Sequence, residues 1–372
     1  MKKVLIVLMM VCFSFTAFAE IRLGGLFAVT GPASFLGNPE KLTVEMLVDQ
    51  MNAAGGINGE KIKLFIYDTQ GREDRAISYF KRLATKDKVI AVLGPSRTGC
   101  ALAIKDLASK FKIPLIACAA SAKIVNPVYK FIFKTPQSDI HVAEKLFDTL
   151  KSKGKTRVAL ISAQSGYGAT GREAVLENAE RFGIEIIADE KFMDTDKDMT
   201  SQLAKIKAKK PDAVICWAAG AAPAIVARNA HALEMTDIYM TQGVASKKFI
   251  ELAGDAANGI KLTAGRLIVA DKLSYSDKFK TMLMKYKNDY ESKFGGAVSV
   301  FGGHAYDAFG LFAIAFAKSG NNSEKLAEEL QQIKGFMGTA GEFNMTAEDH
   351  TGLSKDSFII AEIKNGEFVP AE

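Results

Sequence analysis

Short apolar runs alternate with amphipathic stretches in the first part of the chain. The runs at Ile21–Val29, Lys61–Thr69 and Val89–Gly94 have the length and composition of buried strands. Between them, Glu40–Ala54 and Asp74–Asp87 carry apolar residues at the spacing of one helix face. Strands that alternate with helices through short loops predict a parallel sheet covered on both faces.

A second series of the same kind begins near Lys155. It predicts strands at Arg157–Ala163 and Ile184–Phe192, and helices at Gly168–Gly183 and Asp198–Lys210. Because the pattern of the first series returns at similar length, we predict two doubly wound α/β units rather than one long barrel.

Three extended segments join these units, at Asn126–Asp139, Gly259–Ala270 and Gly335–His350. We interpret them as crossings between two lobes, each built from discontinuous pieces of chain. The predicted fold is therefore α/β, with two doubly wound, Rossmann-like lobes joined by three crossover segments. The cleft between such lobes is the default place for a ligand.

The N-terminus has the pattern of a secretory signal. Lys2 and Lys3 precede an apolar stretch at Val4–Phe18, and a small-residue cleavage site ends at Ala19. We expect cleavage there and an exported protein; an uncleaved anchor is the alternative. The predicted divisions are a signal peptide at 1–19, a first lobe at 20–136 plus 264–338, and a second lobe at 137–263 plus 339–372.

Composition narrows the possible functions. The chain is 48% hydrophobic and 24% charged, as globular proteins are, and its formal net charge is +6. Basic and acidic residues are interspersed, so we expect no nucleic-acid partner. The four histidines lack metal-ligand spacing and no nucleotide or catalytic motif is present. We therefore expect neither metal nor cofactor, and a protein that is not an enzyme.

Three cysteines remain once the signal is removed, namely Cys100, Cys118 and Cys216. An odd number cannot pair completely. A Cys100–Cys118 disulfide is possible at neighbouring strand ends, and buried free thiols are the alternative.

One junction carries candidate chemistry. The strand ending at Gly94 is followed by Ser96, Arg97 and Thr98, and then by a helix. Backbone N–H groups and the positive end of a helix favour a carboxylate at such a place, to which a threonine hydroxyl adds a donor. An ordinary helix cap is the simpler interpretation, and the two are compatible.

Six stretches, in order from Glu20 to Phe368, resemble one known family. They are "TGPASFLG", "MNAAGGINGEKIKL", "AVLGPSRTGCALA", "IPLIACAASA", "NPVYKFIFKTPQSD" and "AYDAFG". Together they are similar to the solute-binding proteins of branched-chain amino acid ABC transporters, the type I periplasmic binding proteins. The resemblance implies a monomeric protein of the periplasm that closes two lobes on a small carboxylate and delivers it to a membrane permease.

The resemblance also implies site residues. Thr98 matches a residue that binds the ligand carboxylate, and Ala119 one whose carbonyl accepts from the ligand ammonium. Ser121 matches a residue whose side-chain hydroxyl contacts the ligand. Tyr167 matches a tyrosine that closes over the ligand. Leu36, preceded by Phe35, matches the apolar side-chain pocket.

Two residues depart from the family's pattern. Gln242 stands where the family commonly has a glutamate for the ammonium group, and Arg97 adds a cation beside Thr98. Arg97 can strengthen carboxylate binding, or it can turn outward or form a salt bridge. Ser96 and Trp217 are further candidates for lining the cleft. The alternative for Trp217 is a position in the hydrophobic core. These departures favour a small apolar carboxylate, with or without an amine. A sensory partner of a separate receptor is the alternative function.

Overall fold

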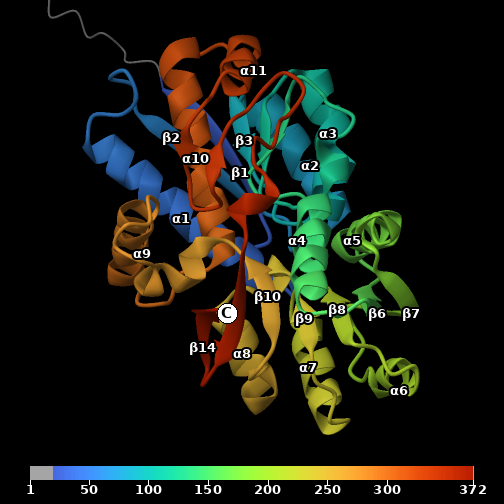
Figure 1. Ribbon diagram of the computed structural model, residues 1–372. Coiled ribbons are helices and arrows are strands. Elements are labelled where there is room, and N and C mark those ends of the chain that lie inside the picture. The colour runs from blue at the N-terminus through green and yellow to red at the C-terminus, as the bar shows by residue number, and fades with distance from the viewer. Residues whose placement is uncertain (1–19, 372) are drawn as a thin grey trace, which may run out of the picture.

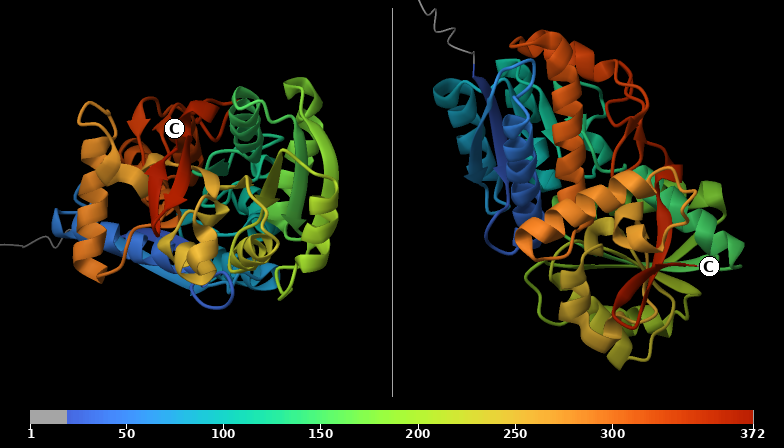
Figure 2. Two further views of the ribbon diagram at one scale, coloured as in Figure 1. Left: turned by 60° about the horizontal axis from the view of Figure 1, so that its bottom comes forward. Right: turned by 90° about the vertical axis from the view of Figure 1, so that its left-hand side faces the viewer.

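The computed structural model describes residues 20–371, so the predicted signal peptide lies outside the described residues. Two large sheets, and a third of only two strands, organise this part of the chain. Figure 1 and the right-hand view of Figure 2 show two lobes, one above the other, each with its own sheet and helices. The predicted two-lobed α/β fold is confirmed.

The first lobe contains five parallel strands in the order β2-β1-β3-β4-β5. They are β1 (Ile21–Phe27), β2 (Ile62–Asp68), β3 (Ala91–Leu93), β4 (Leu115–Ala117) and β5 (Ile132–Lys134). The helices that pack with this sheet are α1 (Ser34–Ala53), α2 (Glu73–Arg82) and α3 (Thr98–Phe111), joined from later in the chain by α10 (Val300–Ser319) and α11 (Ser323–Gln331). The helix α9 (Lys280–Phe294) packs against α1 and α10.

The second lobe contains seven strands in the order β14-β13-β10-β9-β8-β6-β7. They are β6 (Arg157–Ala163), β7 (Glu185–Phe192), β8 (Ala213–Trp217), β9 (Ile238–Met240), β10 (Lys261–Ala264), β13 (Ile359–Lys364) and β14 (Glu367–Pro370). The last two run antiparallel to their neighbours. The helices are α4 (Asp139–Ser152), α5 (Gly166–Asn178), α6 (Thr200–Ala208), α7 (Ala222–Ala232) and α8 (Lys247–Ala253).

Burial explains why these sheets are mostly parallel. All five residues of β8 are buried, as are six of the seven in β6. A strand covered by helices on both faces needs apolar side chains on both faces, which is the pattern that the sequence carries. The helix α1 begins at Ser34, before the predicted start at Glu40, because Pro39 is accommodated inside it. That extension brings Phe35 and Leu36 onto the helix.

The chain passes between the lobes where β5 leads into α4, where β10 leads back toward α9, and before β13. The third passage lies later than the predicted boundary at 338/339. Phe343 and Leu353 still pack in the core of the first lobe, whereas Phe358 packs in the second. The short hairpin of β11 (Phe336–Met337) and β12 (Glu342–Phe343) precedes this passage.

Two further features bear on the predictions. Among the described residues, α10 alone is long and apolar enough to cross a membrane by length and composition, but most of it is buried in this structure, where it packs against α1 and α11 (Figure 1). Cys100, Cys118 and Cys216 are free and buried, so the structure has the free-thiol arrangement and not the Cys100–Cys118 disulfide.

Candidate functional site

A cleft of about 530 Å³ lies between the two lobes. Loops that follow β3 and β4 line it from the first lobe, and loops that follow β6, β7, β8 and β9 line it from the second. The start of α1 and the first turns of α10 complete its wall. The carboxyl ends of parallel strands are the usual ligand-binding edge of such sheets, so both lobes present that edge to one space.

The structure brings most of the predicted site residues to this cleft. Those that line it are Phe35, Leu36, Ser96, Arg97, Thr98, Ala119, Tyr167 and Gln242. Two predicted residues are not part of its lining. Ser121 is fully buried, and its hydroxyl oxygen accepts from the backbone N–H of Lys123 in the following turn. Trp217 is fully buried in the core of the second lobe, against Gly171 of α5.

Two helices begin at the cleft from opposite lobes. α3 begins at Thr98, after an extended Arg97 that makes no side-chain capping bond, and α5 begins at Gly166. They come so close that a Cβ built on Gly166 would lie 2.9 Å from the backbone nitrogen of Gly99. Since the N-terminus of each helix carries a partial positive charge, this point of the cleft attracts an anion, and the carboxyl group of Glu73 already lies beside Gly99.

An apolar wall lies beside these helix ends. The rings of Phe35 on α1 and Phe301 on α10 meet edge to face, with their centroids 5.5 Å apart. Leu36 lies next to Phe35 and is buried. Phe301 was not predicted from the sequence. The wall can take an aliphatic or aromatic group of a ligand.

Ser96 has a structural role within the cleft wall. Its hydroxyl oxygen accepts from the backbone N–H of Ala28 at 3.0 Å and donates to the carboxyl group of Glu40. Glu40 is fully buried, and burial raises the pKa of its carboxyl well above the usual range. The hydroxyl of Ser96 is therefore occupied in holding the loop after β3 to β1 and α1.

Tyr167 and Gln242 face the cleft from the second lobe. The Tyr167 hydroxyl donates to Oγ1 of Thr241 at 2.9 Å, and burial raises its pKa. Gln242 follows directly and is only 3% exposed. Its Oε1 accepts from the Thr263 hydroxyl at 3.4 Å, whereas its Nε2 is buried with no hydrogen-bond partner.

Arg97 forms a salt bridge across the cleft. Its guanidinium lies 2.8 Å from a carboxylate oxygen of Asp194, which follows β7 in the other lobe, and both side chains are about one third exposed, at 31% and 33%. Lys123 and Glu173 form a second ion pair between the lobes. The sequence left three possibilities for Arg97: carboxylate binding, an outward orientation or a salt bridge. The structure has the salt bridge, so Asp194 neutralises the charge of Arg97.

Asp194→Asn is expected to weaken ligand capture about two- to fivefold, because a partly exposed ion pair contributes up to about 1 kcal/mol. The variant should also lose part of the salt dependence of affinity. Calorimetric titration at low and high salt measures both effects, with the small molecule that is released when the purified protein is denatured. The control Glu324→Gln breaks the 2.8 Å pair with Lys112 inside the first lobe. An equal effect of both variants would contradict a role for Arg97–Asp194 between the lobes.

His304 is a lining residue that the sequence did not reveal. It lies on α10, is 4% exposed, and has an Nδ1 atom without a hydrogen-bond partner. Burial, aided by the charge of nearby Lys134, lowers its pKa to about 3, so the ring is neutral at physiological pH. A single histidine on an apolar helix carries no signal of this placement in the sequence.

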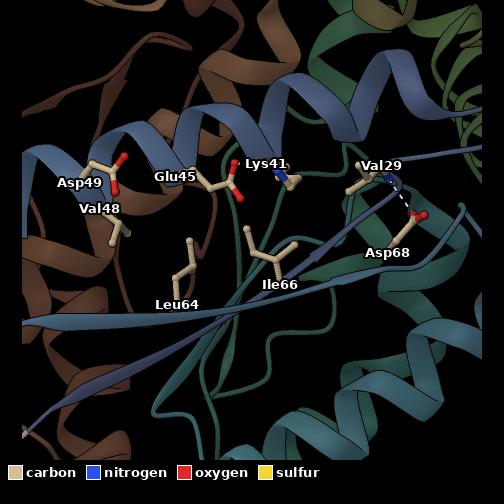
Figure 3. Close-up of a pocket in the computed structure, with 8 residues that line it drawn as sticks. All are labelled: Val29, Lys41, Glu45, Val48, Asp49, Leu64, Ile66 and Asp68. Carbon is tan, nitrogen blue, oxygen red and sulfur yellow. Dashed lines mark hydrogen bonds and ion pairs between the residues drawn. The ribbon is translucent and has the colours of Figure 1, made fainter. Parts of the chain in front are cut away.

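A second hollow lies on the outside of the first lobe, between α1 and β2 (Figure 3). The side chains of Lys41 and Glu45 point from the helix toward Leu64 and Ile66 of the strand. The two charged groups pair with each other at 2.7 Å. Because none of the predicted site residues lines this hollow, the cleft between the lobes is the candidate functional site.

Comparisons with known proteins agree with this geometry. The periplasmic binding protein family matches residues 20–367. A Leu/Ile/Val-binding protein of Rhizobium johnstonii is 25% identical over 96% of this chain and 95% of its own length. An extracellular ligand-binding receptor of Rhodopseudomonas palustris superposes with a TM-score of 0.89 at 27% identity, over 95% of this chain and 100% of that one.

A third similar protein is the branched-chain amino acid transporter substrate-binding protein of Streptococcus pneumoniae, solved in complex with isoleucine. It has a TM-score of 0.84 at 25% identity, over 95% of this chain and 99% of that one. The match to the family model spans nearly all of the described chain, in agreement with the two lobes and the cleft between them. This chain therefore belongs to the periplasmic binding protein family, and it is a binding protein and not an enzyme.

Proposed function

We propose that this protein captures a small carboxylate with an apolar body in the periplasm and delivers it to the membrane permease of an ABC importer. The observation that carries this proposal is the meeting of two helix N-termini, at Gly99 and Gly166, beside the wall of Phe35 and Phe301. A carboxylate beside the two helix ends faces both positive dipole ends at once, and the apolar body covers the rings.

The same arrangement supplies the mechanism of capture. Open lobes admit the acid, and its carboxylate then contacts Thr98 and Gly99 from one lobe and the start of α5 from the other. A ligand that contacts both lobes favours the closed form by the difference between its affinities for the two forms. Leu36 and Tyr167 enclose the body of the acid, and the carbonyl of Ala119 is an available acceptor for a polar hydrogen on it.

The ligands named for two similar proteins support the proposed class of small apolar carboxylates. The Rhizobium relative is a Leu/Ile/Val-binding protein, and the Streptococcus structure holds isoleucine. Branched-chain amino acids are small carboxylates with apolar bodies, and the cleft offers a carboxylate site and an apolar wall. We propose a ligand with a carboxylate and an apolar body. We do not propose that it carries the amine of an amino acid.

Mass spectrometry of small molecules released by denaturing the purified protein tests the proposal directly. We expect a monocarboxylic acid with an aliphatic or aromatic body, which rebinds to the refolded protein with a stoichiometry of about one. Release of a sugar, a polyamine or a dicarboxylate that rebinds in the same way would overturn it. Thr98→Val keeps the shape of the side chain, removes its hydroxyl and should weaken rebinding of the acid at least tenfold.

A further inference from the structure

Within residues 20–371, the buried part of the cleft wall carries no ionised side chain. The charged residues that line the cleft are Glu73, Arg97, Asp194 and Lys197, and each is exposed or only partly buried. The buried polar side chains that line it, among the described residues, are Ser96, Thr98, Gln242 and His304. Since His304 is neutral, this inner wall offers hydrogen bonds but no countercharge. A buried ammonium group there would lose its water without gaining an anion.

Two of these side chains have polar atoms that the protein leaves unpaired. Nε2 of Gln242 and Nδ1 of His304 are buried and have no hydrogen-bond partner. A buried donor without a partner destabilises the folded protein, so native proteins rarely retain one without a reason. The Thr263 hydroxyl donates to Oε1 of Gln242, and the N–H groups at the other end of the amide therefore remain to be satisfied.

Gln242 also lies close to the expected carboxylate position. Thr241, its neighbour in the chain, accepts from the hydroxyl of Tyr167, and Tyr167 directly follows Gly166 at the start of α5. A Cβ built on Gly243 would lie 3.0 Å from the Tyr167 ring. Gln242 therefore lies in the same lobe as the start of α5, and both line the same cleft.

We propose that Gln242 donates to an uncharged oxygen on the carbon next to the ligand's carboxylate, and that His304 completes this subsite, so that the cleft selects 2-oxo or 2-hydroxy acids over 2-amino acids. The inference rests on the proposed function, and it names the substrate class within it. An oxo or hydroxyl oxygen accepts the hydrogen of the Gln242 amide, whereas an ammonium group brings a further donor and a positive charge to a donor.

A matched series of acids tests the inference by calorimetric titration. The series is 4-methyl-2-oxopentanoate, 2-hydroxy-4-methylpentanoate, 4-methylpentanoate and leucine, and a second series carries a phenyl group in place of the isopropyl group. We expect the oxo or the hydroxy acid of one series to bind at least tenfold more tightly than the matched acid without the 2-oxygen, and than the matched amino acid.

Variants assign the selection to Gln242. Gln242→Glu places a carboxylate beside the 2-position, so it should weaken binding of the oxo acid at least tenfold and strengthen binding of the matched amino acid. Gln242→Leu should remove the preference for the 2-oxygen. Gln164→Glu is the control, because it makes the same change at an exposed residue of the same cleft and should preserve the preference. Thermal denaturation identifies any variant that does not fold.

The outcomes separate the inference from the proposed function. If leucine or 4-methylpentanoate binds the wild-type protein as tightly as the oxo and hydroxy acids, the inference is overturned and carboxylate capture stands. If Gln242→Glu leaves the ranking of the acids unchanged, Gln242 does not set it, and the inference is again overturned. If no acid of either series binds, while the molecule released from the purified protein is of another class, the proposed function fails together with the inference.

Discussion

Gly166→Leu is expected to abolish tight ligand capture while the protein remains folded. The Cβ of any side chain at this position would lie 2.9 Å from the backbone nitrogen and 3.2 Å from the Cα of Gly99, in the opposite lobe. Backbone atoms at the start of α3 cannot move aside as a flexible side chain can. Overpacking costs about 1–3 kcal/mol, and we expect the upper part of that range, a loss of affinity of roughly 100-fold.

Opening of the lobes relieves this clash, so the thermal stability of the ligand-free protein should change little. Calorimetric titration gives the affinity, and small-angle X-ray scattering shows whether the variant fails to become more compact with ligand. Gly296→Leu is the matched control, because a Cβ at Gly296 meets no heavy atom within 4 Å. Wild-type affinity in Gly166→Leu would mean that capture does not require the close approach of α3 and α5.

Asp307→Ala is expected to produce the largest loss of stability among these variants. The fully buried carboxylate accepts from the backbone N–H groups of Thr339 at 2.5 Å and Ala340 at 2.9 Å, and from the Thr339 hydroxyl at 3.0 Å. Alanine would leave three buried donors unpaired. At about 1–3 kcal/mol for each such group, the free energy of unfolding should fall by at least about 3 kcal/mol. Urea denaturation followed by circular dichroism measures this loss.

The pH dependence of stability distinguishes the charge of Asp307 from its shape. Burial raises the pKa of Asp307 from 3.8 to about 7, against the opposing effect of the three hydrogen bonds. Between these pKa values the unfolded chain has released the proton that the folded chain retains, so the contribution of Asp307 to stability falls as the pH rises from about 4 to about 7.

Asp307→Asn should remove this part of the pH dependence. His304, whose pKa is lowered to about 3, has the opposite effect, because its contribution is lost as the pH falls from about 6.5 toward 3. The wild type and Asp307→Asn share this contribution of His304. The difference between their free energies of unfolding at each pH therefore reports Asp307 alone. Parallel stability curves over this pH range would contradict a raised pKa for Asp307.

The fold could be predicted from the sequence because the local patterns agree with one another. The strand at Arg157–Ala163 was predicted with the bounds that the structure has, since apolar residues fill both of its faces. The helix α4 was not predicted, although Val142, Leu146 and Leu150 recur at helical spacing, because the extended interpretation of the preceding segment ran up to Asp139.

The site could be predicted only in part. Thr98 and Ala119 follow strand ends, and the topology of a parallel sheet brings such positions to one edge. The partner of Arg97 lies 97 residues away in the other lobe, and no local pattern predicts that pair. The inner position of His304 depends on the packing of α10 against the first lobe, which a solitary histidine in an apolar helix does not indicate.

The two ends of the described chain belong to different sheets, β1 at the start and β14 at the end. A fluorescent donor attached near Glu20 and an acceptor near Ala371 would therefore each be carried by a different lobe. Energy transfer between them would report the relative movement of the lobes in real time, without any label in the cleft. The order of strands thus makes this protein a scaffold for an optical sensor of its ligand.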